Sequence, residues 1–215
     1  MGIWTLIRFA LITGILICSA PGHSQAQRRS IQDEGTEKRN YGDPIPGEDG
    51  QAPDSSFDMS LIEAAKSGGV AEARGAFLRG ESVNSRKSGG APALLIAAQS
   101  GNIAVLRFLL EKQANPDLYE KSTGHSPLIA AAQLGNDSMV RMLLSHKANP
   151  NHQDRQGETA LIKAVRAGSA EVVRSLLGAG ADVNATDYAG HTALWHAIDA
   201  RHDQIAKMIE AAGGA

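Results

Sequence analysis

Histidine is the residue type in this 215-residue chain whose clustering could bind a metal or catalyse a reaction. Two groups of candidate ligands occur, namely His146, His152 and Asp154, and then His191, His196 and His202. Ligands on one face of a helix stand three or four residues apart, as in H-E-x-x-H. His191 and His196 are five apart and His196 and His202 six, so neither pair shares a helical face. We therefore expect solvated polar loop residues and predict neither a metal site nor a catalytic residue.

The chain also lacks the motifs that activate a nucleophile or cradle a phosphate. Cys18 is its only cysteine, and neither a G-x-S-x-G elbow nor a Gly-rich loop ending in Lys-Ser/Thr is present. Ser88-Gly89-Gly90 resembles a phosphate loop, but its place among the repeats described below is a hairpin turn, where glycine supplies a positive φ. We predict that the protein is not an enzyme and uses no cofactor. A metal-dependent hydrolase that uses the histidines is an alternative.

A leucine recurs at a nearly constant interval along the C-terminal part of the chain. Five segments align on Leu61, Leu94, Leu128, Leu161 and Leu194, at spacings of 33, 34, 33 and 33 residues. A second column, three positions later, consists of Ala64, Ala97, Ala131, Ala164 and Ala197. A period this steady indicates a stack of repeats, and such stacks usually act through a contact surface and not through a buried reaction centre.

The letters around the leucines indicate the type of repeat. Ser126-Pro-Leu-Ile-Ala-Ala131, Thr159-Ala-Leu-Ile-Lys-Ala164 and Thr192-Ala-Leu-Trp-His-Ala197 are similar to the T-P-L-H-x-A stretch of the ankyrin repeat. Gly180-Ala-Asp-Val-Asn-Ala185 is similar to its G-A-D-x-N-A stretch. The chain thus resembles a short, exported ankyrin-repeat protein of a bacterial type. The resemblance implies an all-α solenoid of about five helix-turn-helix repeats joined by β-hairpin-like loops, at about 58–84, 85–117, 118–151, 152–184 and 185–215.

Polar residues stand where helices of such repeats begin. Ser126, Thr159 and Thr192 are expected N-caps of the first helices, and Pro127 suits a first helical position because its missing N–H has no partner there anyway. The second helices have candidate caps at Asn102, Asn136 and Ser169. The glycines at 68, 101, 135 and 168 stand where a left-handed residue would end each first helix, and Arg201 replaces glycine in the last copy.

The chain departs from the family pattern at two places. Leu95, Ile129, Ile162 and Trp195 replace the motif histidine, so we expect the hydrogen-bond bridge from that histidine to the capping turn to be absent and each turn to be less polar. One extra residue falls within Leu118–Thr123 in the third repeat. We expect it to lengthen a loop without shifting the helices.

The two end repeats differ from the middle ones. The first carries Glu63, Lys66, Arg74 and Arg79 at helical positions, and the last replaces an apolar residue by Glu210. Terminal repeats of a stack need a polar outer face. We therefore expect 58–84 and 185–215 to be caps, and the stack to be complete.

Residues 1–26 have the layout of a secretory signal peptide. Phe9–Ala20 is a 12-residue, almost wholly apolar run, and Ser24-Gln25-Ala26 provides small residues for cleavage before Gln27. An uncleaved anchor is the alternative, although a membrane span needs about 20 apolar residues. We predict a periplasmic or secreted protein with no stable membrane span after cleavage.

Removal of this segment would leave no cysteine, and 20 Lys and Arg against 23 Asp and Glu, a formal net charge of −3. That balance argues against a nucleic-acid partner, which favours clustered basic residues. Residues 27–57 contain Pro44, Pro46 and Pro53 and few residues that could enter a core, so we expect a disordered linker. The repeat domain is expected to occupy 58–215.

The resemblance also implies where a partner binds, because ankyrin proteins use the hairpin tips and the exposed side of the first helices as a concave surface. The corresponding positions are Ser88, Gln99, Ser122, Thr123, His125, Gln133, Leu134, Arg155, Gln156, Glu158, Arg166, Tyr188, His191 and Asp199. Tyrosine and arginine supply much of the energy of protein interfaces when they become buried. We predict a monomeric, non-catalytic protein-binding module. A secreted effector that binds a host protein and an accessory factor for a periplasmic enzyme are alternatives.

Overall fold

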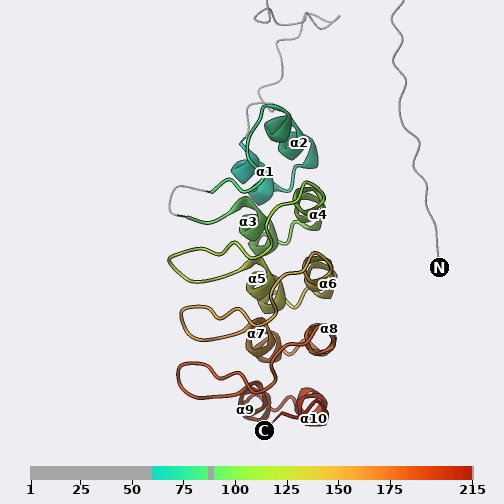
Figure 1. Ribbon diagram of the computed structural model, residues 1–215. Helices are drawn as coiled ribbons and strands as arrows, with labels where there is room; N and C mark the ends of the chain where they lie inside the picture. The colour runs from blue at the N-terminus through green and yellow to red at the C-terminus, as the bar shows by residue number, and fades with distance from the viewer. Residues whose placement is uncertain (1–59, 87–89, 215) are drawn as a thin grey trace, which may run out of the picture. The chain divides into compact units, whose positions relative to one another are not determined.

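The structure is a computed structural model that describes residues 60–86 and 90–214 (Figure 1). In these ranges the chain forms ten α-helices, and each of the five predicted repeat ranges contains one pair of them. The first helices are α1 (Leu61–Ser67), α3 (Ala93–Gln99), α5 (Pro127–Gln133), α7 (Ala160–Arg166) and α9 (Ala193–Asp199). The second helices are α2 (Val70–Leu78), α4 (Ile103–Glu111), α6 (Asp137–Ser145), α8 (Ala170–Gly178) and α10 (Asp203–Ala211). The predicted signal peptide, the predicted linker and Ser88 lie outside the described residues.

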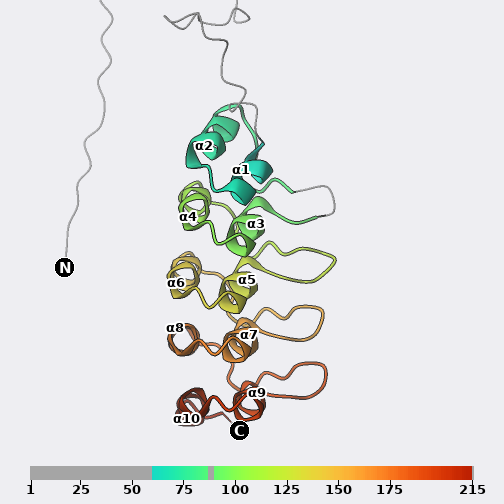
Figure 2. The same cartoon turned by 180° about the vertical axis from the view of Figure 1, so that it is seen from behind.

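The helix pairs stack in two layers. Each first helix contacts the next first helix along the chain, and each second helix contacts the next second helix. The hairpin connections project from the side of the first helices (Figures 1 and 2). In the described ranges these connections hold no strand, only isolated bridges between Arg86 and Pro92 and between Thr186 and Thr192. The predicted all-α repeat solenoid is therefore confirmed.

The leucine column fills the contact between successive first helices. Leu61, Leu94, Leu128 and Leu161 are all fully or almost fully buried, and so are all five alanines of the second column. Alanine has no side chain beyond Cβ, so neighbouring helices can approach closely at these positions. Leu194 is only partly buried, because no described helix packs against the outer side of α9.

The predicted caps of the first helices are confirmed. The hydroxyl oxygens of Ser126, Thr159 and Thr192 accept from backbone N–H groups three residues later. All three residues predicted for the second helices occupy the N-cap position, but only the side chain of Asn136 makes a capping hydrogen bond, accepting from Met139 N. The side chains of Asn102 and Ser169 make no such bond and turn to the preceding repeat instead.

In that position Asn102 Nδ2 donates to Ala65 O and Lys66 O, and Ser169 Oγ donates to Gly135 O. Both side chains therefore join repeats. The four column glycines have positive φ as predicted, and Arg201 takes a φ of 57° in the same place.

Two further sets of hydrogen bonds join the repeats. In the first, side-chain oxygens accept from a backbone N–H of the next repeat, as in Asn149 N to Asp117 Oδ1 (2.8 Å) and Asp182 N to Asn151 Oδ1 (2.8 Å). In the second, successive hairpins bond through their backbones, Arg155 N to Thr123 O (3.0 Å) and Tyr188 N to Gln156 O (3.0 Å). The hairpins of the third to fifth repeats are therefore held in fixed positions relative to one another.

The extra residue of the third repeat lies in its hairpin. Glu120 N donates to His125 O across five positions, whereas the next hairpin closes from Asp154 N to Glu158 O across four. The helices on either side keep the same lengths as those of the next repeat. The loop thus absorbs the insertion, as predicted.

The two end repeats expose charged side chains, and the last one exposes large apolar side chains as well. Glu63, Lys66, Arg74, Arg79 and Glu210 are all exposed, as expected of caps. Trp195 and Ile198 on α9 are exposed too, although Ile162 and Val165 at the same positions of α7 are buried. Among the described residues no helix has the length and apolar character that would span a membrane.

Candidate protein-binding groove

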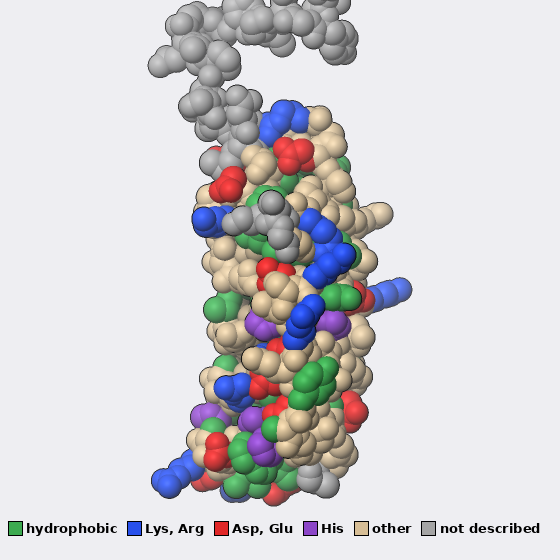
Figure 3. Space-filling view, turned by 90° about the vertical axis from the view of Figure 1, so that its left-hand side faces the viewer, with side chains coloured by type: hydrophobic (Ala, Val, Ile, Leu, Met, Phe, Trp, Pro, Cys, Tyr) green, Lys and Arg blue, Asp and Glu red, His purple; other side chains and the backbone are tan. Residues whose placement is uncertain are grey.

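A groove of about 730 Å³ lies between the hairpins and the first helices in the middle of the stack. The hairpins of the third and fourth repeats provide one wall, and α5 and α7 provide the other. The lining side chains belong to Ser122, Thr123, His125, Gln133, Arg155, Gln156, Lys163, Arg166 and Ala167. We call this cavity the central groove. Figure 3 looks onto the side from which the hairpins project, where Lys, Arg, Asp and Glu side chains are interspersed.

Seven of the predicted binding residues line the central groove, so the structure brings half of that set together. Gln99 and Leu134 line a smaller cavity of about 250 Å³ that shares His125 and Gln133 with it. Arg155 and Tyr188 stand at the same position of successive hairpins and both line a further cavity of about 410 Å³. His191 is partly exposed and Asp199 exposed in the fifth repeat, where they line none of these three cavities.

Glu158 does not belong to the exposed surface, contrary to the prediction. Only 4% of this residue is accessible, and its carboxylate pairs with Lys163 through one oxygen and with Arg166 through the other. Lys163 is buried as well, whereas more than half of the Arg166 side chain is exposed. A buried carboxylate needs such partners, because loss of hydration would otherwise be very unfavourable. Glu158 therefore supports the groove from beneath.

Asp154 completes this network at the base of the hairpin. Its Oδ1 accepts from Gln156 N (2.8 Å) and Glu158 N (2.9 Å), which closes the turn. Its fully buried Oδ2 lies 3.0 Å from Lys163 Nζ and 3.4 Å from His125 Nε2. The hairpin and α7 are thus joined by an ion pair across the floor of the groove.

This ion pair corrects the expectation that each turn would be less polar. The motif histidine is indeed replaced by Ile162, but the next residue, Lys163, reaches the hairpin instead. In the fifth repeat His196 occupies the same position, and its Nε2 lies 2.9 Å from Asp187 Oδ2. The polar bridge is therefore shifted by one residue in these two repeats.

The charges of this network cancel, and among the described residues of the groove one further cation outside it remains free to bind a ligand. Asp154 and Glu158 are balanced by Lys163 and Arg166. The side chain of Arg155 is exposed at the rim, and no ion pair holds it within the described part of the chain. The groove therefore offers hydroxyl, amide and imidazole groups with one uncompensated guanidinium. A free guanidinium can donate charge-assisted hydrogen bonds to a carboxylate oxygen.

Comparison with protein families agrees with this architecture. The family model described as ankyrin repeats (3 copies) matches residues 61–154 and, a second time, residues 146–213. The chain belongs to the ankyrin-repeat family. Ankyrin repeats generally mediate protein–protein interaction, and the family is typically a non-catalytic interaction module. Comparison with curated proteins gave no match.

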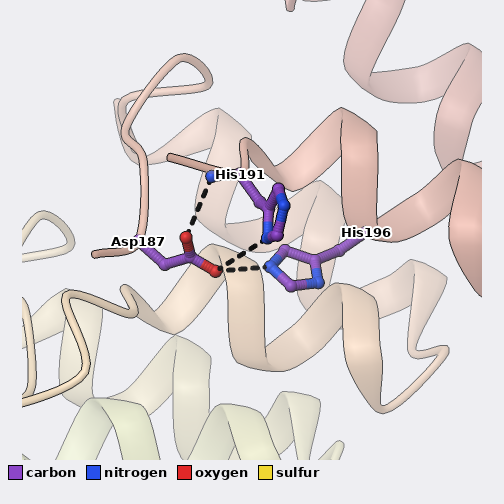
Figure 4. A group of neighbouring side chains, drawn as sticks. All are labelled: Asp187, His191 and His196. Atoms are coloured by element: carbon purple, nitrogen blue, oxygen red, sulfur yellow. Dashed lines mark hydrogen bonds and ion pairs between the residues drawn. The ribbon is translucent and has the colours of Figure 1, made fainter. Parts of the chain in front are cut away.

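The fifth ankyrin repeat contains a second polar cluster, which the sequence analysis did not anticipate. Asp187 Oδ2 lies 2.9 Å from His196 Nε2 and 3.7 Å from His191 Nδ1 (Figure 4). The two histidines do not share a helical face, as expected, but His191 precedes α9 and points toward the same carboxylate as His196 does. The expectation of separate, solvated loop residues was therefore wrong for this pair.

Hydrogen bonds keep the Asp187 carboxylate ionised. Partial burial acts to raise its pKa, but the bonds from His191 N, the His196 ring and Ala189 N outweigh this, so the pKa lies below its ordinary value. The other predicted histidine group is not assembled in the same way. His146 bonds to Met142 O at the end of α6, while His152 bonds to Gly124 O beneath the hairpins.

Lys163 and Ala167 line the central groove without having been predicted, and Lys163 is the charged one of the two. A signal for it exists, since Asp154 and Lys163 are nine residues apart and Asp187 and His196 repeat this spacing 33 residues later. An aspartate that closes the hairpin therefore predicts a contact with the residue nine positions on when that residue is polar.

Proposed function

We propose that this ankyrin-repeat protein is an exported, non-catalytic module, periplasmic or secreted, that acts as a monomer and binds a segment of a partner protein in the central groove. The observation that carries this proposal is the groove itself. Its lining comes from two hairpins and two helices, and seven of its residues stand at the positions that ankyrin proteins use for binding. Two alternatives, an effector for a host protein and an accessory factor for a periplasmic enzyme, would use the same surface.

The walls of the groove are organised before any ligand arrives. Backbone hydrogen bonds fix each hairpin to the next, and the Asp154–Lys163 ion pair fixes the fourth hairpin to α7. Groups that are already ordered lose little conformational entropy on association, which favours affinity. A rigid groove of this kind therefore selects by shape and charge.

The residues at the rim are of the types that dominate interface energies. Tyr188 is 76% exposed at a hairpin tip, and Arg155 occupies the same position of the preceding hairpin. Leu134 is an exposed apolar residue at the C-terminal end of α5. Aromatic and arginine side chains gain most when a partner desolvates them. We infer that the partner segment crosses the hairpin tips and inserts an acidic or carbonyl group beside Arg155.

The test is the double variant Arg155→Ala/Tyr188→Ala, with Arg107→Ala/Arg174→Ala on the second helices as a matched control. All four residues are exposed, and none of these side chains takes part in an ion pair within the described residues. We expect unchanged circular dichroism and melting for both proteins. Capture by the tagged protein, followed by mass spectrometry, should lose one specific partner in the first variant only.

A separate variant, Arg166→Ala, examines the floor of the groove. It is kept apart from the double variant because Arg166 also pairs with the buried Glu158.

Capture that survives Arg155→Ala/Tyr188→Ala but is lost with Arg107→Ala/Arg174→Ala would place the partner on the second helices and would overturn the proposal.

A further inference from the structure

The Asp187 cluster of the fifth repeat has the donor set of a metal site. Asp187, His191 and His196 each offer one ligand atom, and these three atoms lie within 4.8 Å of one another. No second group of three His, Cys, Asp or Glu residues comes this close in the part of the chain that the structure describes. We propose that these three residues bind a divalent transition-metal ion, and that zinc fits them.

The distances suit tetrahedral coordination. Zinc bonds to nitrogen and oxygen ligands are about 2.0–2.1 Å long, so neighbouring ligand atoms of a tetrahedron lie roughly 3.3–3.4 Å apart. The two observed separations from Asp187 Oδ2, 2.9 Å and 3.7 Å, lie on either side of that value. The two ring nitrogens lie within 4.8 Å of each other, so the rings have to turn toward a common centre to take up an ion. Two imidazoles and one carboxylate form a ligand set of known zinc sites.

Groups around the cluster already orient the ligands. Asp187 Oδ1 accepts from Ala189 N (2.9 Å) and His191 N (2.9 Å), which directs Oδ2 toward the two rings. The indole of Trp195 stacks on the His191 ring, with centroids 3.6 Å apart and planes 10° from parallel. Contacts of this kind around the ligands fix their orientation and raise metal affinity.

The fourth repeat shows what these positions do when they hold a cation. Asp154, Glu158 and Lys163 stand 33 residues before Asp187, His191 and His196. There the Lys163 ammonium lies between the two carboxylates, and Arg166 supplies the second positive charge through Glu158. The fifth repeat has the same backbone frame and the same aspartate, but imidazoles replace Glu158 and Lys163. A metal ion would supply the positive charge that the ammonium supplies one repeat earlier.

The cluster is open on one side. The exposed fraction of the side chain is 9% for Asp187, 12% for His196 and 35% for His191. Three protein ligands with solvent access leave a coordination position for water or for a side chain of a partner.

The experiment uses the protein with an affinity tag that lacks histidine, stripped with a chelator and titrated with Zn²⁺ by calorimetry. We expect one ion per chain. His196→Gln and Asp187→Asn should each weaken binding by about tenfold or more, because even changes to groups around the ligands cost 10–100-fold. The amide oxygen that Asp187→Asn introduces can still accept the two backbone hydrogen bonds, so the hairpin is preserved. His146→Gln, at the end of α6, is the control and should bind as the unchanged protein does.

Spectroscopy tests the coordination geometry of the site separately from its affinity for the ion. Co²⁺ in place of Zn²⁺ should give the intense d–d absorption of a tetrahedral site, and His191→Gln should reduce it. Circular dichroism of every variant establishes that the repeats remain folded. Absence of stoichiometric binding by the unchanged protein, or equal binding by His196→Gln and Asp187→Asn, would overturn the proposal. The central groove lies one repeat away and contains none of these ligands, so failure here leaves the binding proposal intact.

Discussion

At the scale of single residues, one position determines which side chain bonds to the hairpin of a repeat. It directly follows the place of the family's motif histidine. Lys163 and His196 occupy it in the fourth and fifth repeats, and both reach the aspartate nine residues earlier. Ala130 occupies it in the third repeat and offers no polar group. One position thus carries an ammonium, an imidazole or a methyl group on an otherwise similar backbone.

Lys163→Met should be strongly destabilising. It removes the ammonium between two buried carboxylates while keeping a side chain of similar length. Loss of one partner from a buried ion pair costs about 3–5 kcal/mol in the free energy of unfolding. Urea denaturation measures it, with exposed Lys207→Met on α10 as the control, for which we expect a change within roughly 0.5 kcal/mol. Equal midpoints for the two variants would mean that water reaches the network.

At the scale of elements, stacking of the hairpins depends on how closely their backbones approach. Gly157 has a φ of 77°, and a Cβ there would lie 2.6 Å from Tyr188 Cδ1 and 2.8 Å from Tyr188 N. Gly190 has a similar φ of 83° at the same position of the next hairpin, but a Cβ would meet nothing within 4 Å. Substitutions at these two glycines therefore distinguish the cost of left-handed backbone strain from the cost of disturbing the contact between hairpins.

Gly190→Ala should cost only the left-handed strain, about 1–2 kcal/mol. Gly157→Ala should cost more, because the methyl group also displaces Tyr188 and lengthens the hydrogen bond from Tyr188 N to Gln156 O. Thermal or urea unfolding of the two proteins side by side measures the difference. Equal losses would show that the hairpins move apart without cost.

Leu161 and Leu194 form a similar pair in the helix layer. Leu161 is fully buried between α5 and α9, whereas Leu194 is only partly buried on α9. Leu161→Ala should cost about 2–5 kcal/mol. Because a stack is coupled only through neighbouring repeats, this loss in the middle should also broaden the transition beyond two-state unfolding. Leu194→Ala should cost less and keep a single transition; the reverse order would contradict the assigned repeat boundaries.

Local chemistry explains which features could be predicted. The caps at Ser126, Thr159 and Thr192 depend on residues three positions apart, so sequence spacing was enough to find them. Glu158 could not be placed correctly, because its burial depends on ion pairs with Lys163 and Arg166 on a neighbouring element. The meeting of His191 and His196 was missed for the same reason. A rule based on helical spacing does not apply to this pair, because His191 precedes the helix.

At the scale of the whole molecule, the two ends of the stack differ. The N-terminal repeat exposes charged side chains, whereas α9 exposes Trp195 and Ile198 at positions that are buried in the middle repeats. Histidine side chains show on the hairpin side in its central and C-terminal parts (Figure 3). The histidines of the described part of the chain thus all lie in the last three repeats.

The proposed export of the chain predicts a defined mature N-terminus. The apolar run and the small residues Ser24 and Ala26 should direct signal peptidase to cut before Gln27. The exported protein should then lack Cys18, the chain's only cysteine, and carry no thiol. Intact mass and N-terminal sequencing of the protein from the periplasm or the medium measure this. Recovery of the full-length chain from membranes would show that residues 1–26 are an anchor.

The hydrogen bonds between repeats have a consequence for how the protein can change over evolution. Asn151 and Asn184 are identical residues at the same position of successive repeats. The backbone hydrogen bonds that join the fourth hairpin to the hairpin before it and to the hairpin after it connect equivalent N–H and carbonyl groups. A tandem duplication of residues 152–184 would therefore create junctions that reuse existing contacts. It would add one hairpin and one helix pair and extend the proposed binding surface by a whole unit. Copy number, as well as point substitution, is thus a route by which a protein of this design can acquire a longer ligand.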